Sequence, residues 1–341
     1  GLLHGQLYGL ALENSTFDLL ELSTDPTAEP QDDYLKDPSA PDHLSGRFYP
    51  TSYKWGGFDD PKAVIDTELN LWADPTEQPA GYTYFLGDSK VEHPAVDPDI
   101  SRTRYVQNMT QEGGLLGFDF ANILNEITGN DADGNGLPDF LSVDVTRMLG
   151  AFDGALTLKT GGKGVASNGE SAAKHIEKDV EKLVSPDGLQ WIQGPDGDVL
   201  IIDEDSGNDW GERKMALVID DSDLSVTDGY FLAQAAGKYN ARDLAGASAL
   251  GGALRSATSA EFSGSWDVSP LVATDANGDF FTAADLAGTG YQDISNTIDI
   301  NDKTLIGVVQ SRGQSGGAVE RLQADAGGQI FQFSLDLPEK A

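Results

Sequence analysis

The apolar residues of this chain are gathered into short runs bounded by Gly, Asp, Asn or Pro. The runs are rich in Val, Ile, Phe and Tyr, and several alternate apolar with polar residues, which is the pattern of β-strands. Strands are therefore expected at residues 6–13, 83–88, 155–160, 189–193, 198–205, 214–220, 304–312 and 329–337.

The clearest local prediction is a β-hairpin over residues 189–203, with its turn at Pro195, Asp196 and Gly197. Helical patterns are fewer. Residues 171–184 have Ser171 as a candidate N-cap and an apolar face. Residues 115–127 fit either a strand that leads into a short helix or a helix throughout, and residues 240–257 fit either a helix or a flexible insertion.

Short strands joined by Asp/Gly turns, with helices only as insertions, predict an all-β or mainly β fold. We expect a β-propeller or an incomplete one, although no clean repeat of about 40 residues is visible. The alternative is a β-sandwich with calcium loops.

A single domain over residues 1–341 is expected, or a part of a longer chain, since Gly1 opens directly on an apolar stretch. Residues 23–62 are rich in Pro and acidic residues, which predicts an irregular surface segment.

Acidic residues greatly outnumber basic ones, 56 to 22, and give a formal net charge of −34. Self-repulsion on this scale opposes compaction unless cations screen it, and it makes nucleic acid and anionic membranes poor partners. No apolar run approaches the length of about 20 residues that a membrane span needs. The chain has no cysteine, which excludes disulfides and thiolate chemistry. Acidic loops of this kind suit a secreted or cell-surface protein, extracellular or periplasmic.

The stretch GNDADGNGLPDF at residues 129–140 predicts a calcium loop. Alternate oxygen ligands converge when the backbone coils around an ion, and a glycine permits the sharp turn. Ser142 replaces the terminal Glu of an EF-hand, so the stretch is closer to the shorter calcium loops of extracellular modules, with Asp144 as a candidate last ligand. The expected ligands are Asp131, Asp133, Asn135, the carbonyl of Leu137, and Asp139; the alternative is an unliganded turn.

Two further acidic stretches are candidate cation sites. One contains Asp275, Asn277 and Asp279 at alternate positions, followed by Asp285, with Phe280 where a glycine is expected. The other follows a predicted strand and contains Asp203, Asp205 and Asp209, for which a solvated hairpin end is the alternative. Oxygen ligands of this kind favour Ca²⁺, and Mg²⁺ is also compatible with them.

Two arginines stand close together in this acidic chain, Arg102 and Arg104. Paired arginines can clamp a phosphate or sulfate, but more often they bridge acidic loops. Other catalytic signatures are absent from the sequence: there is no phosphate-binding loop, no nucleophile elbow and no His-Glu-x-x-His metal motif.

Residues 185–209, SPDGLQWIQGPDGDVLIIDEDSGND, resemble a blade of the PhoX-type alkaline phosphatase and phytase-like propellers. The resemblance rests on an SPDG turn, a PDG hairpin and an acidic strand end. It implies a secreted calcium-dependent phosphoester hydrolase, with Asp203, Asp205 or Asp209 near the metals and Arg102 or Arg104 as phosphate clamps.

The sequence thus leaves two functions open. The favoured one is a calcium-braced extracellular module that binds a partner or serves as a subunit of a larger extracellular assembly. The alternative is a calcium-dependent hydrolase acting on a phosphoester substrate. Both predict calcium binding, and they differ in whether the protein turns over a phosphoester.

Overall fold

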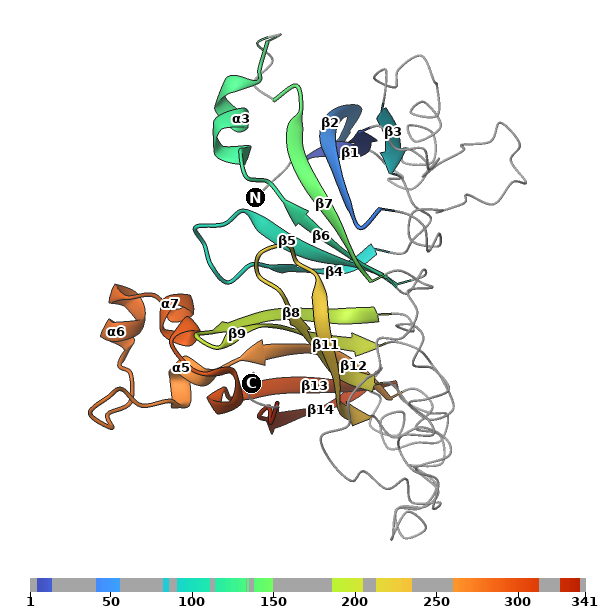
Figure 1. Cartoon of the computed structure of the whole chain (residues 1–341). Coiled ribbons are helices and arrows are strands. Elements are labelled where there is room, and N and C mark those ends of the chain that lie inside the picture. Colours follow the sequence, from blue (N-terminus) through green and yellow to red (C-terminus); the bar gives the residue numbers. More distant parts are fainter. Residues whose placement is uncertain are drawn as a thin grey trace.

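The chain is mainly β, with three antiparallel sheets that do not close into a ring in the part that the structure describes (Figure 1). This computed structural model describes residues 5–13, 41–55, 82–85, 91–110, 114–132, 134, 138–149, 186–204, 213–234, 260–312 and 326–337. No helix within these ranges is long and apolar enough to cross a bilayer.

The first sheet has seven strands in the order β3-β1-β2-β7-β6-β5-β4. Four of them, β4 to β7, follow one another along the chain as an up-and-down meander. A short helix, α3 (Ile123–Gly129), joins β6 to β7. The strands are β1 (Gly5–Glu13), β2 (His43–Trp55), β3 (Tyr82–Phe85), β4 (Val91–Val96), β5 (Arg104–Met109), β6 (Gly114–Asp119) and β7 (Leu141–Leu149).

The second sheet is a four-stranded meander in the order β11-β10-β9-β8. The predicted hairpin is confirmed as β8 and β9, the first two strands of this sheet along the chain. Gly194 pairs with Gly197 across a turn made by Pro195 and Asp196. Gly197 has a φ of +142°, which favours glycine at this place. The strands are β8 (Pro186–Gly194), β9 (Gly197–Glu204), β10 (Arg213–Ile219) and β11 (Val226–Gln234).

The third sheet is a three-stranded meander of β12 (Ala260–Asp267), β13 (Leu305–Arg312) and β14 (Ala326–Phe333). The connection from β12 to β13 carries a group of short helices at one end of the sheets (Figure 1). They are α5 (Ser269–Val272), α6 (Ala283–Gly288), α7 (Tyr291–Asn296) and the 3-10 helix η2 (Ile300–Asp302).

The three sheets stack in layers, and the second sheet lies in the middle (Figure 1). Between the first and second sheets, one apolar core joins Val106 and Leu115 to Trp191 and Leu217. A separate core joins the other face of the second sheet to the third sheet. Strand β9 is buried on both faces, which explains why residues 199–202 are a continuous apolar run instead of an alternating one.

Most predicted strands whose residues are described are confirmed, and residues 115–127 are a strand followed by a helix, β6 and α3. Within the segment of residues 23–62 that was expected to be irregular, residues 43–55 form the strand β2, and residues 23–40 and 56–62 lie outside the described residues. Leu44 and Phe48 are four residues apart, so they lie on the same face of β2, and both pack on the core that contains Phe118 and Val145. Their burial outweighs the local abundance of Pro and Asp. The elements predicted at 155–160, 171–184 and 240–257 lie outside the described residues.

Candidate functional site

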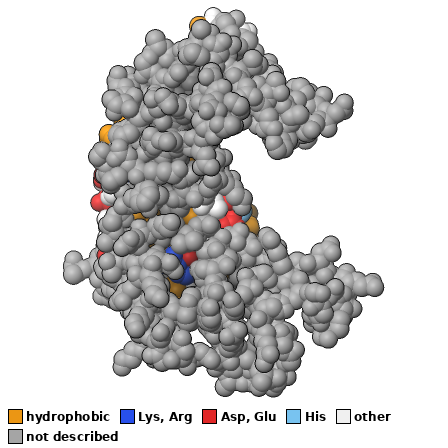
Figure 2. Space-filling model, turned by 90° about the vertical axis from the view of Figure 1, so that its right-hand side faces the viewer, with side chains coloured by type: hydrophobic (Ala, Val, Ile, Leu, Met, Phe, Trp, Pro, Cys, Tyr) orange, Lys and Arg blue, Asp and Glu red, His pale blue; other side chains and the backbone are white. Residues whose placement is uncertain are grey.

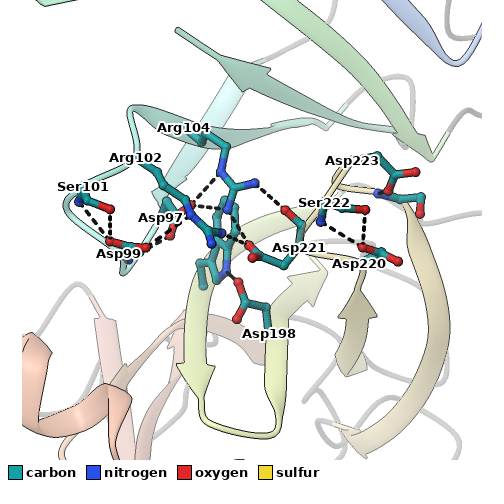
Figure 3. Close-up of polar contacts among 12 residues, drawn as sticks. Asp97, Asp99, Ser101, Arg102, Arg104, Asp198, Asp220, Asp221, Ser222 and Asp223 are labelled. Carbon is teal, nitrogen blue, oxygen red and sulfur yellow. Dashed lines mark hydrogen bonds and ion pairs between the residues drawn. The ribbon is translucent and has the colours of Figure 1, made fainter. Parts of the chain in front are cut away.

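Arg102 and Arg104 lie between two acidic turns and are bonded to both (Figure 3). The Arg104 guanidinium donates to Asp97 Oδ2 at 2.7 Å from Nε, and to Asp221 Oδ1 at 2.6 Å and the Asp221 carbonyl at 2.7 Å. Arg102 pairs with Asp221 and, at 3.2 Å, with Asp99. The first turn precedes β5, and the second joins β10 to β11, so these bonds tie the first sheet to the second.

Both arginine charges in this network are paired with carboxylates of the protein. Hydrogen bonding from Arg102, followed by that from Arg104, lowers the pKa of Asp221 to about 2. Burial raises the pKa of Asp97 even though Arg104 opposes that shift. On the face shown in Figure 2, a small basic area (blue) has acidic side-chain atoms (red) next to it. The two arginines therefore bridge acidic loops, which is the more common of the two roles considered for such a pair. Both guanidinium groups are bonded to carboxylates of the protein.

Asp198 lies beneath this network (Figure 3) and accepts a hydrogen bond from Trp191 Nε1 at 3.1 Å. The Trp191 ring in turn stacks under the Arg104 guanidinium, 5.4 Å from the ring centroid. Burial raises the pKa of Asp198 to about 6. This buried acid was not expected from the sequence, because it stands among hairpin residues that look like an ordinary turn.

Asp203 belongs to the interior instead of to a surface metal site. Its side chain is 1% exposed, pairs with Lys214 through Oδ1, and accepts the Gly264 N–H through Oδ2 at 2.8 Å. The partner of this carboxylate, which the sequence offered as a metal ligand, is therefore the Lys214 ammonium group. The other two members of that acidic stretch, Asp205 and Asp209, lie outside the described residues.

The loop at residues 131–139 is described at both ends. Asp139 closes it: its Oδ2 accepts the Ala132 N–H at 3.0 Å, and its own N–H donates to the Asn130 carbonyl at 2.5 Å. Gly134 has a φ of +71°. Three expected ligands, Asp133, Asn135 and Leu137, lie outside the described residues, so only Asp131 and Asp139 of the predicted set are described.

Asp144, the candidate last ligand of that loop, lies elsewhere in the first sheet. It pairs across β6 and β7 with Asp119 and accepts a hydrogen bond from Ser45 Oγ at 2.8 Å. The residue that reaches back toward the loop is Glu126 on α3, whose Oε2 accepts the Ser142 N–H at 2.7 Å. The backbone N–H of Ser142 is thus bonded to a side chain of α3.

The loop at residues 275–279 is described in full and coils around the first carboxylate. Asp275 Oδ1 accepts the N–H groups of Asn277 at 2.8 Å and Asp279 at 2.9 Å, and the Asn277 amide lies 3.0 Å from Asp275 Oδ2. An N–H to carbonyl bond from Asp275 to Asp279 closes the turn at 2.8 Å. These backbone donors lower the pKa of Asp275, with Asp279 the largest contributor.

The sharp bend of this loop is at Gly278, with a φ of +85°, and not at the sixth position. Phe280 therefore needs no special backbone conformation. Asp285, expected as a further ligand, serves a different purpose: its Oδ2 accepts the Thr282 N–H at 2.7 Å and forms the capping box of α6.

The two loops begin with the same pattern, Asp-Ala-Asp-Gly at 131–134 and Asp-Ala-Asn-Gly at 275–278. In both, the fourth residue is a glycine in the left-handed region, Gly134 and Gly278. A comparison of the two stretches by their fourth position, rather than by the sixth position of an EF-hand, would have found this relationship in the sequence.

A polar cleft of about 340 Å³ opens between the first sheet and the β10–β11 turn. Asp119 and Asp144 line it as cross-strand neighbours on β6 and β7, and burial, with a smaller contribution from the Asp144 charge, raises the pKa of Asp119. Its lining residues are His43, Leu44, Ser45, Arg104, Asp119, Asp144, Thr146, Ser222, Asp223 and Leu224. Strand register creates the cleft, so no local sequence pattern reveals it.

Comparisons with protein-family models, with curated proteins and with solved structures find no match. The resemblance of residues 185–209 to PhoX-type propellers therefore remains an expectation from the sequence.

Proposed function

We propose that this protein is a secreted or cell-surface β-rich module whose acidic loops bind Ca²⁺, and that the ions brace the fold for binding or assembly. The observation that carries the proposal is the loop at residues 275–279. There the backbone coils around Asp275 and holds Asn277 and Asp279 at alternate positions next to it. The same opening pattern at residues 131–134 supports a second ion-binding loop.

The residues of the described loop fit a hard cation. Side chains at positions one, three and five supply the oxygen ligands of calcium loops, and here they are Asp275, Asn277 and Asp279. Rotation of the Asn277 side-chain amide exchanges its nitrogen and oxygen, so it can present an oxygen where it now donates to Asp275 Oδ2. A bound ion would hold these ligands together and screen part of the net charge of −34.

The fold supports a propeller-like arrangement as the finer form of this proposal. Adjacent propeller blades are meanders packed face to face, and three consecutive meanders pack in this way here: β4 to β7, β8 to β11 and β12 to β14. The alternative β-sandwich also packs sheets face to face, but it needs only two layers.

The hydrolase alternative has less support. Its candidate phosphate ligands, Arg102 and Arg104, are bonded to Asp97, Asp99 and Asp221, and its candidate metal ligand Asp203 is paired with Lys214. Within the described part of the chain, the geometry therefore favours ions that brace loops over ions that polarise a phosphoester.

A calcium titration followed by calorimetry tests the proposal. Protein stripped with a chelator should bind Ca²⁺, and Asp275→Asn should remove one binding event or weaken it at least about tenfold, since a carboxylate ligand is lost. Asp223→Asn is the matched control, because Asp223 also accepts a backbone N–H in an exposed turn, from Ser225 at 2.9 Å. Equal binding by wild type and Asp275→Asn, or no binding by the wild type, would refute the proposal.

A further inference from the structure

A second kind of metal-binding group lies where the first and second sheets meet. Glu92 and His93 belong to β4, and Asp187 belongs to β8. Each offers a ligand atom, and these atoms all lie within 4.8 Å of one another. His93 Nδ1 is 3.0 Å from Asp187 Oδ1 and 3.2 Å from the Asp187 carbonyl oxygen. The His93 imidazole of β4 therefore lies against a carboxylate from a different strand, β8.

A buried asparagine fixes the backbone on both sides of this group. Asn108 on β5 is 0% exposed, donates its side-chain N–H to the Asp187 carbonyl, and accepts the Glu92 N–H at 3.1 Å. Thr110 adds a hydrogen bond from its hydroxyl to the Pro186 carbonyl at 2.5 Å. The segments that carry the three side chains are thus held in place by polar contacts that do not involve those side chains.

The donor set differs from that of the calcium loops. One imidazole nitrogen with two carboxylates suits a transition metal such as Zn²⁺, whereas Ca²⁺ takes oxygen ligands alone. The His93 side chain is 61% exposed, so an ion can enter from solvent, while Asp187 is only 13% exposed and lies closer to the sheets. Three protein ligands leave a coordination position for water.

We propose that Glu92, His93 and Asp187 form a site for one divalent transition-metal ion of the zinc class, which cross-links β4 to β8. The ion replaces the direct contact between His93 and Asp187 and joins the first sheet to the second at the edge of their shared core. Because none of these residues belongs to the calcium loops, the site stands or falls independently of calcium binding.

Zinc titration with calcium present in large excess tests the site, because the calcium fills oxygen-only sites. The variants are His93→Ala and Asp187→Asn, and the control is His43→Ala, which removes the histidine that contacts Thr146 in the polar cleft. Wild type and His43→Ala should bind one zinc ion more than His93→Ala, or bind it at least about tenfold more tightly. Zinc should also raise the melting temperature of wild type and of His43→Ala, and not that of His93→Ala or Asp187→Asn.

Two results would overturn the proposal: a wild type that binds no zinc, or a His93→Ala variant that binds zinc with unchanged stoichiometry and affinity. His93 is exposed, so its replacement by Ala should leave the fold intact, and circular dichroism of the variant checks this. A failure of zinc binding with calcium binding retained would reject this site while leaving the calcium proposal in place.

Discussion

The ammonium group of Lys214 is hydrogen-bonded to Oδ1 of Asp203 between the second and third sheets, with the two side chains 0% and 1% exposed. Lys214 also donates to Ser265 Oγ at 2.6 Å and lies 5.1 Å from the centroid of the Phe262 ring. Burial is the main influence on both groups, raising the pKa of Asp203 and lowering that of Lys214. Two layers of the fold are therefore joined, through Ser265 and Gly264, to a charge pair that is inaccessible to solvent.

Replacement of Lys214 by Met should destabilise the protein strongly. The carboxylate of Asp203 would stay buried without its partner, which costs about 3 to 5 kcal/mol of unfolding free energy. Urea denaturation measures the loss. The double variant Lys214→Met with Asp203→Asn should recover part of it, because the amide oxygen still accepts the Gly264 N–H. A single variant within about 1 kcal/mol of wild type would contradict the account of this pair.

The two neighbouring arginines should differ in their contributions to stability. Arg104 is buried between Asp97 and Asp221, so Arg104→Ala should cost about 3 to 5 kcal/mol. Arg102 is 37% exposed, and Arg102→Ala should cost about 1 kcal/mol or less although it contacts the same Asp221. Arg104→Lys should restore only part of the loss, since an ammonium cannot bond both carboxylates as a guanidinium does. Equal costs for the two alanine variants in urea denaturation would count against the structural role of Arg104.

The buried acid Asp198 should make stability depend on pH. Its pKa is about 6 in the folded protein against 3.8 for a free side chain. Between these two pKa values the folded chain holds a proton on Asp198 that the unfolded chain has lost. The unfolding free energy of the wild type therefore falls as the pH rises through this range. Asp198→Asn keeps an acceptor for Trp191 but cannot ionise. The unfolding free energy of the variant minus that of wild type should rise by about 2 kcal/mol from about pH 4.5 to about pH 7.

This Asp198 prediction depends on a difference between two proteins, so other titrating groups cancel. A difference that stays constant over the same pH range would show that the Asp198 carboxyl titrates normally in the folded state.

Elements whose signal is local were predictable from the sequence. The hairpin of β8 and β9 carries its own turn residues, and the apolar run of residues 199–202 indicates burial on both faces. The strand β2 was missed because the pattern of its neighbours, rich in Pro and Asp, dominates that interval, while its packing depends on residues far along the chain such as Val145.

The site residues divide in the same way. The spacing of Asp275, Asn277 and Asp279 is local, and the structure brings them together in one turn. The partners of Asp203 and Arg104 were not predictable, because Lys214 and Asp221 reach them only through strand pairing and sheet stacking. The juxtaposition of His93 with Asp187 likewise depends on contact between two sheets, 94 positions apart in sequence.

Thermal unfolding in calcium and in a calcium chelator, at equal ionic strength, tests the central claim most directly. An ion that binds only the folded state stabilises it by about 2.7 kcal/mol per site when its concentration is one hundred times the dissociation constant. We predict a melting temperature that rises with calcium, a smaller rise for Asp275→Asn, and no comparable rise when sodium chloride replaces calcium. A melting temperature that is the same in calcium and in chelator would contradict the account.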